Sequence, residues 1–347
     1  MADKKFVVFD AHCDTISKIF ETGESLEKNN LHVSLERLGK YRSFVQFFAV
    51  WLDDCYASQS PYMLQSSWEN QGCYANQSPY ALQSPFENQS PFGWTAKMLE
   101  NFYRELEKSS LPTRMILWGS DLDLVLGQNE IGCLLSIEGS EAFEGDLRLL
   151  RALHRLGVRA VTLVWNRDNE AAYSIASSDK SGGLTPFGRE VICEMERLHM
   201  LADVSHLSIK GFWDVMECSS MPVIASHSNS LYASAHPRNL SDDQFLALAQ
   251  KGGVAGINLC SDFLNMEQQA SMNDILCSAD HFLSLGGEDT VCFGADLDGV
   301  ELLPKGIHSA GDYDKIIEAF GKAGYSDALI EKILYKNLYR VIKQVLK

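Results

Sequence analysis

The sequence has no long hydrophobic run, no closely paired cysteines and no excess of basic residues. No apolar stretch approaches the roughly 20 residues that a membrane-spanning helix needs, so we expect no membrane partner. The nine cysteines are scattered and never spaced as Cys-x-x-Cys, which is typical of reduced thiols in a cytoplasmic protein. The charged residues 1–5 lack the apolar core of a signal peptide, which also favours a cytoplasmic location.

The charge balance is strongly acidic. Lys and Arg number 30 against 46 Asp and Glu, which gives a formal net charge of -16. Such a surface repels phosphate backbones, so we expect no nucleic-acid partner. A site for divalent cations would account for part of the excess, because it needs carboxylates without matching Lys or Arg residues.

Short, continuously apolar runs alternate with segments of helical spacing almost throughout the chain. The eight runs cover residues 6–9, 44–51, 131–137, 158–165, 201–206, 222–227, 253–259 and 290–296. Strands of this kind joined by helical crossovers indicate a parallel sheet that is covered on its outer face. Their number predicts a single (β/α)8 barrel of the TIM type over residues 1–347. A doubly wound open sheet is the alternative, although no glycine-rich phosphate loop follows any run.

Several of the intervening helices have recognisable signals. Thr185 followed by Pro186 predicts a helix start, and the spacing of Ser241 and Gln244 predicts a capping box. Apolar residues at helical spacing predict a further helix over residues 93–107.

A duplicated polar segment follows the second apolar run. Residues 56–71 recur as residues 74–89 with twelve of the sixteen positions identical, and a third fragment, 90–92, comes next. Gln, Ser, Asn and Pro cannot build a core, so residues 56–93 are predicted to be a loop insertion. Two roles stay open, a tolerated surface expansion or a lid whose aromatic residues pack over a nearby site.

Acidic and imidazole side chains recur where the apolar runs end. They are His12, Asp14, Glu138, His206, His227 and Asp296. In a barrel the carboxyl ends of all strands meet on one face, which is where such enzymes place their chemistry. Three imidazoles and several carboxylates without thiolate pairs suit Zn(II), with Mn(II) or Fe(II) as alternatives. The competing interpretation is structural, with His12 as a buried core residue and Asp14 and Asp296 as helix caps.

Six segments together resemble the membrane dipeptidase (renal dipeptidase) family of metallopeptidases, peptidase family M19, in the form of a soluble bacterial-type member. The segments are Phe9-Asp10-Ala11-His12-Cys13-Asp14, Ser136-Ile137-Glu138-Gly139, Asp203-Val204-Ser205-His206, Ala225-Ser226-His227-Ser228, His236-Pro237-Arg238-Asn239 and Gly294-Ala295-Asp296-Leu297-Asp298-Gly299. The resemblance keeps the order of the segments and covers the chain apart from residues 56–93.

The resemblance implies a binuclear zinc site. His12 and Asp14 would hold one ion, His206 and His227 the other, and Glu138 would bridge the two together with a water or hydroxide. Such a pair of ions activates a water molecule and polarises a carbonyl group. The implied reaction is hydrolysis of the peptide bond of dipeptides, including those with a D-residue at the C-terminal position, and family members are commonly homodimers.

The resemblance also assigns roles to three further residues. Asp296 matches the carboxylate that acts as general base and acid. Arg238 matches the residue that binds the free carboxylate of the substrate. Trp165 stands where mammalian-type members have a histidine that helps to hold the tetrahedral intermediate, so another donor such as Asn166 or Arg167 would have to substitute.

Two other functions remain open from the sequence. The ligand set alone also permits a barrel amidohydrolase that acts on cyclic amides, lactones or N-acyl amino acids. A metal-stabilised binding protein without activity is the third hypothesis, because Trp165 and the insertion both depart from the family pattern.

Overall fold

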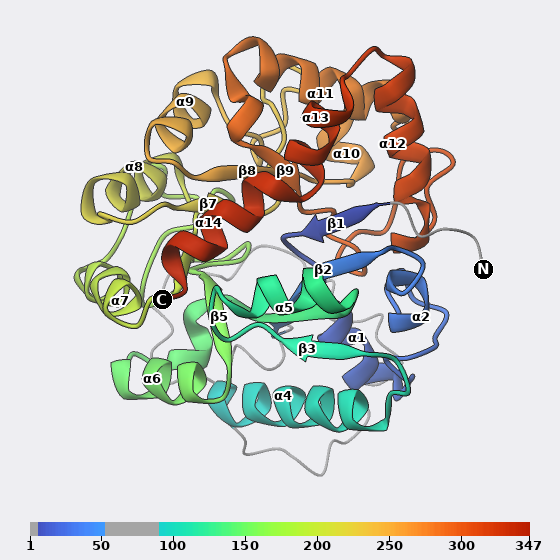
Figure 1. Ribbon diagram of the computed structural model, residues 1–347. Coiled ribbons are helices and arrows are strands. Elements are labelled where there is room, and N and C mark those ends of the chain that lie inside the picture. Colours follow the sequence, from blue (N-terminus) through green and yellow to red (C-terminus); the bar gives the residue numbers. More distant parts are fainter. Residues whose placement is uncertain (1–5, 53–89) are drawn as a thin grey trace.

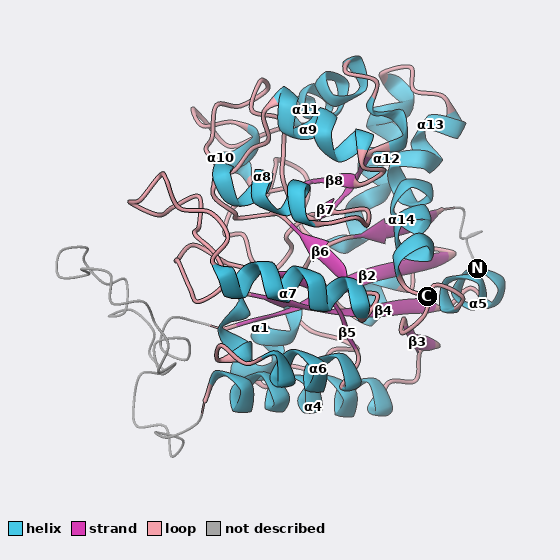
Figure 2. Cartoon of the chain, turned by 90° about the vertical axis from the view of Figure 1, so that its left-hand side faces the viewer, coloured by secondary structure: helices cyan, strands magenta, loops and turns pink. Residues whose placement is uncertain are grey.

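The computed structural model describes residues 6–52 and 90–347, and its centre is a parallel β-barrel surrounded by helices (Figures 1 and 2). The barrel strands are β1 (Val7–Asp10), β2 (Ser43–Trp51), β4 (Ile131–Glu138), β5 (Val158–Thr162), β6 (Leu201–Asp203), β7 (Ile224–Ala225), β8 (Val254–Ile257) and β9 (Val291–Phe293). They are hydrogen-bonded in the order β2-β1-β9-β8-β7-β6-β5-β4, and β2 pairs with β4, which closes the circle. The predicted (β/α)8 barrel is therefore confirmed, and the open sheet is wrong.

One strand was not predicted. β3 (Thr113–Met115) pairs in parallel with the first three residues of β4. It lies on the same edge of β4 with which β5 pairs nearer the carboxyl end of that strand. All three residues of β3 are only partly buried. Because the strand is short and lies outside the closed barrel, it lacks the continuous apolar run that marks the other eight.

The long strands are apolar on both faces because both faces are covered. All eight residues of β4 and eight of the nine in β2 are buried. Inside the barrel, Phe9, Val45 and Leu134 belong to a cluster that also contains Val341 and Ile342 of α14 (Asn337–Val345). Helix α14 thus covers the amino-terminal end of the barrel, which leaves the carboxyl end for a site (Figure 1).

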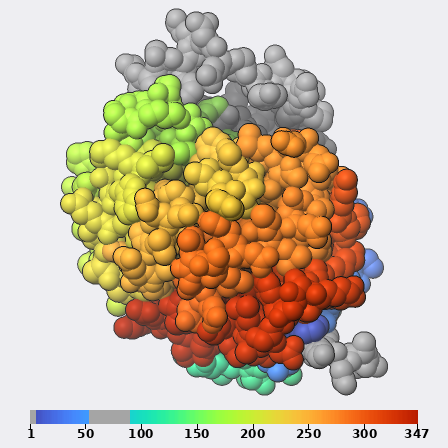
Figure 3. Space-filling view, turned by 90° about the horizontal axis from the view of Figure 1, so that it is seen from above, coloured from blue at the N-terminus to red at the C-terminus, as the bar shows by residue number. Residues whose placement is uncertain are grey.

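Helices fill the connections between the strands. The longer ones are α1 (Thr15–Thr22), α4 (Pro91–Lys108), α5 (Asp121–Gln128), α6 (Leu147–Arg155), α7 (Pro186–Arg197), α8 (Ile209–Cys218), α9 (Asp242–Gln250), α11 (Met272–Ser284) and α12 (Tyr313–Lys322). Seen from above, α9, α11 and α12, coloured from yellow-orange to red, contribute to one continuous face of the molecule (Figure 3). Shorter helices are α2 (Leu35–Leu38), α10 (Ser261–Leu264) and α13 (Asp327–Glu331).

The predicted helix caps are present. Thr185 Oγ1 accepts a hydrogen bond of 3.0 Å from the backbone of Gly188, and Pro186 opens α7. Ser241 and Gln244 form the reciprocal pair of a capping box at the start of α9. These local signals were sufficient because each depends only on residues within one turn.

The boundary of the predicted insertion needs a correction at its end. Residues 91–93 form the first turn of α4 rather than part of a loop, because Ser90 caps the helix and Pro91 occupies its first position. Residues 56–89, and with them the proposed lid, lie outside the described residues. Among the described residues, no helix combines the length and the apolar character needed to cross a bilayer.

Candidate metal centre

The predicted site residues converge at the carboxyl end of the barrel, where all six are buried. His12 and Asp14 follow β1, Glu138 ends β4, His206 follows β6, His227 follows β7 and Asp296 follows β9. A parallel bridge between Cys13 and Leu297 joins the ends of β1 and β9. This bridge places His12 and Asp14, which follow β1, beside Asp296, which follows β9.

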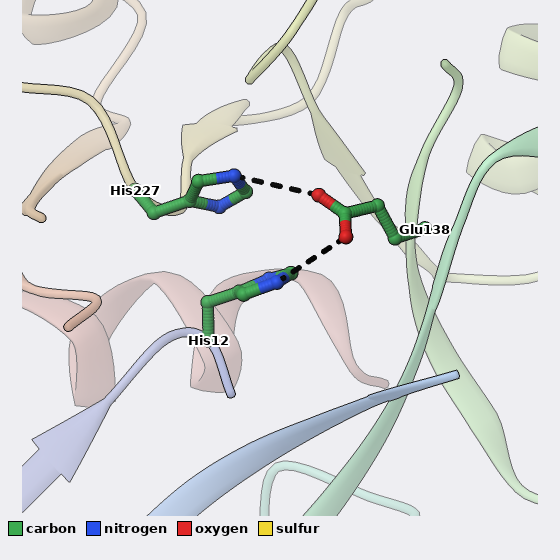
Figure 4. A group of neighbouring side chains, drawn as sticks. All are labelled: His12, Glu138 and His227. Carbon is green, nitrogen blue, oxygen red and sulfur yellow. Dashed lines mark ion pairs between the residues drawn. The ribbon is translucent and has the colours of Figure 1, made fainter. Parts of the chain in front are cut away.

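Glu138 lies at the centre of the group. Its Oε1 is 3.2 Å from His206 Nε2 and 3.4 Å from His227 Nε2. Its Oε2 is 3.6 Å from His12 Nε2, on the other side (Figure 4). One oxygen of the Glu138 carboxylate therefore faces His206 and His227, and the other faces His12.

A second set of ligands surrounds His12. Its Nε2 lies 3.7 Å from Asp14 Oδ2 and 3.9 Å from Asp296 Oδ1. Asp14 directly precedes α1, but its side chain makes no capping hydrogen bond to that helix. The structural interpretation of Asp14 as a helix cap is therefore wrong.

The donor set suits divalent cations. His12 Nε2, Asp14 Oδ1 and Glu138 Oε1 are buried and have no hydrogen-bond partner among the described residues. Two groups of three residues, one of His12, Glu138 and His227 and one of His12, Asp14 and Asp296, bring a ligand atom of each member within 4.8 Å of the others. Buried polar atoms without partners are costly, and a metal ion coordinated by nitrogen and oxygen removes that cost.

Glu138 and the imidazoles around it shift each other's pKa values. Burial alone raises the pKa of Glu138, but His12 and His206 outweigh it and hold this pKa well below its usual range. At His12 burial lowers the pKa, yet Glu138 and Asp14 raise it well above the ordinary value. The carboxylates around His12 thus favour a positive charge at this point of the site.

Asp296 differs from the other carboxylates. Burial, followed by the neighbouring carboxylates Asp14 and Glu138, raises its pKa to about 7 despite the opposing effect of His12. Its Oδ2 accepts a hydrogen bond of 2.9 Å from the amide of Asn258, the residue after β8. Asn258 was not predicted, although a polar residue inside the apolar run 253–259 was an available signal.

Some site residues have unusual backbone conformations. His206 and Asp296 have φ angles of 66° and 60°, and Asp298 has 69°. The side chain of Asp298 accepts hydrogen bonds of 2.6 Å from Thr15 Oγ1 and from the backbone of His32, which gives it a structural role. Left-handed conformations of residues other than glycine are unfavourable and are found where the site requires them.

A cavity of about 470 Å³ opens onto the centre. Trp51, Trp165 and Asn166 line it together with Asp14, Glu138, His206 and Asp296. The two indole rings meet edge to face with centroids 5.0 Å apart, so they form one aromatic wall. Trp51 was not predicted, because its contact with Trp165 depends on the closure of the barrel.

Arg238 is buried against the backbone of His227 and is not among the described residues that line the cavity. It is 8% exposed, its Nη2 is 3.5 Å from the carbonyl oxygen of His227, and its guanidinium lies over the ring of Phe263. Its Nε has no hydrogen-bond partner among the described residues. The guanidinium therefore keeps an unused donor.

Comparison with known protein families identifies the family of this chain. The profile of the membrane dipeptidase family, peptidase family M19, matches residues 2–347. An uncharacterised protein in the pqqA 5′ region of Klebsiella pneumoniae is 31% identical over 241 residues, which cover 67% of this chain and 89% of the relative.

Solved structures share the fold. A metallopeptidase from Rhodobacter sphaeroides, liganded with a phosphinate mimic of the dipeptide L-Ala-D-Ala, superimposes with a TM-score of 0.81 at 24% identity, covering 98% of this chain and 99% of the other. The probable dipeptidase PvdM from Pseudomonas aeruginosa gives a TM-score of 0.76 at 16% identity, with 99% and 96% of the two chains covered.

Proposed function

The chain belongs to the membrane dipeptidase family of metallopeptidases, peptidase family M19, and we propose that it hydrolyses the peptide bond of dipeptides with two zinc ions. The observation that carries this proposal is the position of Glu138, whose two carboxylate oxygens face separate sets of imidazoles. The family supports a metal-dependent hydrolase, and the count and identity of the ions are part of the proposal.

The ligands divide into two sets around Glu138. His12 and Asp14 would hold one ion, and His206 and His227 the other, with Glu138 shared by both. When bound, such a pair of ions supplies a water of lowered pKa and polarises the scissile carbonyl group.

Asp296 is the proposed proton carrier. Its Oδ1 faces His12, and the residue lines the cavity in which a substrate would lie. We expect Oδ1 to receive the proton of the attacking water and to deliver it to the departing amine nitrogen. The hydrogen bond from Asn258 to Oδ2 would hold the carboxyl group in the orientation for both steps.

Substrate binding would use both ends of the cavity. Arg238 would bind the free carboxylate once its side chain turns into the cavity past Phe263, since a guanidinium fork suits this anion. Trp165, with Trp51, would pack against the substrate from the other side, and a D-residue at the C-terminal position would be accepted, as with the dipeptide mimic in the bacterial structure.

The organisation of the whole chain is part of the same proposal. We expect residues 1–347 to form a single barrel domain with the duplicated segment as an insertion, and the protein to form a homodimer. The seven cysteines of the described residues are all free thiols, which supports a cytoplasmic location.

The test is amine release from a panel of L,L and L,D dipeptides by the zinc-loaded protein, with a chelator-treated control. Hydrolysis that the chelator abolishes is expected. Absence of hydrolysis at full metal occupancy would contradict the proposal. Turnover restricted to N-acyl amino acids or lactones would assign the site to another class of amidohydrolase.

A further inference from the structure

The imidazole of His227 is held by a buried chain of hydrogen bonds that begins at Asp203. Asp203 ends β6 and Ser226 directly follows β7, and these two strands pair with each other. Ser226 Oγ is hydrogen-bonded to Asp203 Oδ2 and lies 2.6 Å from His227 Nδ1. The three residues are at most 4% exposed, so water cannot replace these contacts.

The direction of each hydrogen bond follows from the groups around Asp203. Its Oδ1 accepts from the backbone N–H groups of Ser205, at 3.0 Å, and Ser226, at 2.9 Å. Its Oδ2 accepts from Thr162 Oγ1, at 2.7 Å, and from Ser226 Oγ. A carboxylate can accept at all four positions only when it is ionised, so the single hydroxyl hydrogen of Ser226 points to Asp203.

This direction determines which nitrogen of His227 carries a hydrogen. Because the hydroxyl hydrogen of Ser226 is engaged by Asp203, Ser226 Oγ can only accept a hydrogen bond from His227. His227 Nδ1 therefore carries a hydrogen, and Nε2, which faces Glu138 Oε1, keeps its lone pair.

His206 has the same tautomer for a different reason. Its Nδ1 lies 3.1 Å from Asn166 Oδ1, an amide oxygen that can only accept. The Nε2 atoms of His206 and His227 lie 2.9 Å apart, both close to Glu138 Oε1. Three electron pairs thus converge on one small region, an arrangement that favours a cation.

We propose that Asp203 and Ser226 are positioning residues that fix the Nδ1-protonated tautomer of His227 and thereby present its Nε2 lone pair to a divalent metal ion. The inference rests on the metal centre of the proposed function. Outer hydrogen-bond partners of metal-bound histidines typically change metal affinity about 10- to 100-fold when they are removed.

The backbone contacts of Asp203 predict what an amide would do there. In Asp203→Asn the amide oxygen must occupy the Oδ1 position, because the backbone N–H groups of Ser205 and Ser226 point at it. The amide nitrogen then faces Ser226 Oγ and can donate to it. The hydroxyl hydrogen becomes free to point at His227 Nδ1, which permits the tautomer that carries its hydrogen on Nε2 and cannot bind metal there.

The test measures zinc affinity of the full, metal-free chain by competition with a chromophoric chelator. Ser226→Thr and Ser226→Val form an isosteric pair that differs only in the hydroxyl group. We expect Ser226→Val, Ser226→Ala and Asp203→Asn to lose about 10- to 100-fold in the affinity of one of the two ions. Ser226→Thr should bind at least tenfold more tightly than Ser226→Val.

The matched control is Ser43→Ala, at the other end of the barrel, where the buried hydroxyl donates to the carbonyl oxygen of Val125. It should bind zinc as the unchanged protein does. Equal affinities of the threonine and valine variants, or wild-type affinity of Ser226→Ala, would overturn the proposal. Zinc affinity is measured without substrate. If the protein fails to hydrolyse dipeptides, the proposed function is rejected, but the zinc affinities still test the roles of Asp203 and Ser226.

Discussion

Glu138→Gln removes the negative charge from the centre of the site with almost no change in shape. The carboxylate faces His206 and His227 through one oxygen and His12 through the other, at distances of 3.2 to 3.6 Å. An amide at this position keeps one oxygen and presents an NH2 group to the other set of imidazoles. One ion would therefore lose a ligand, and both would lose the attraction of the charge.

The expected loss can be estimated from the lost charge. A unit negative charge roughly 4 Å from a unit positive charge contributes about 4 kcal/mol at an effective dielectric constant near 20, and a divalent ion carries two such charges, so this figure is a lower bound. Since about 1.4 kcal/mol corresponds to a factor of ten, we expect zinc affinity to fall at least about 1,000-fold. Competition with a chromophoric chelator, followed by metal analysis after dialysis, measures this loss directly.

A buried glutamate outside the site provides the control. Glu194 on α7 is 7% exposed and pairs with Arg151 and Arg197, so Glu194→Gln should lower stability without changing zinc affinity. Two ions retained by Glu138→Gln with unchanged affinity would refute the central role of this carboxylate.

Three further predictions concern proton transfer, substrate binding and stability. Asp296→Asn should retain both metals but lower kcat by about 10²- to 10⁴-fold, whereas wild-type turnover would exclude Asp296 as the proton carrier. Arg238→Met should raise KM for dipeptides about 10- to 100-fold and leave the KM of their C-terminal amides unchanged, and equal effects on both would contradict its role. Burial and the nearby Glu141 raise the pKa of Glu170 from 4.5 to about 8. The folded protein therefore binds the additional proton, and stability from this group is lost as the pH rises from 4.5 through 8. Glu170→Gln should flatten this part of the pH profile in denaturant titrations, and an unchanged profile would refute the assignment.

The barrel, and the residues at the carboxyl ends of its strands, could be predicted from the sequence alone. Each barrel strand is a continuous apolar run, and a charged or imidazole residue directly after such a run stands out without knowledge of the fold. The short strand β3 has no such run and was missed. The end of the insertion was misplaced because the Ser-Pro pair at residues 90–91 also occurs inside the repeats.

Contacts between strands could not be predicted in the same way. Asp203 and Ser226 stand in motifs that were noticed, but their hydrogen bonds depend on the pairing of β6 with β7. The contact between Trp51 and Trp165 requires the closed barrel. The burial of Arg238 against the backbone of His227 likewise depends on the packing of a loop that has no periodic pattern.

The left-handed backbone at His206 and Asp296 has a consequence for laboratory evolution. A residue with a side chain costs roughly 1 to 2 kcal/mol in this conformation relative to an ordinary one, and glycine avoids that cost. A library selected only for folding or heat resistance should therefore drift toward glycine at both positions. The same library selected on a dipeptide as nitrogen source should keep histidine and aspartate, so the two selections would separate at these two codons.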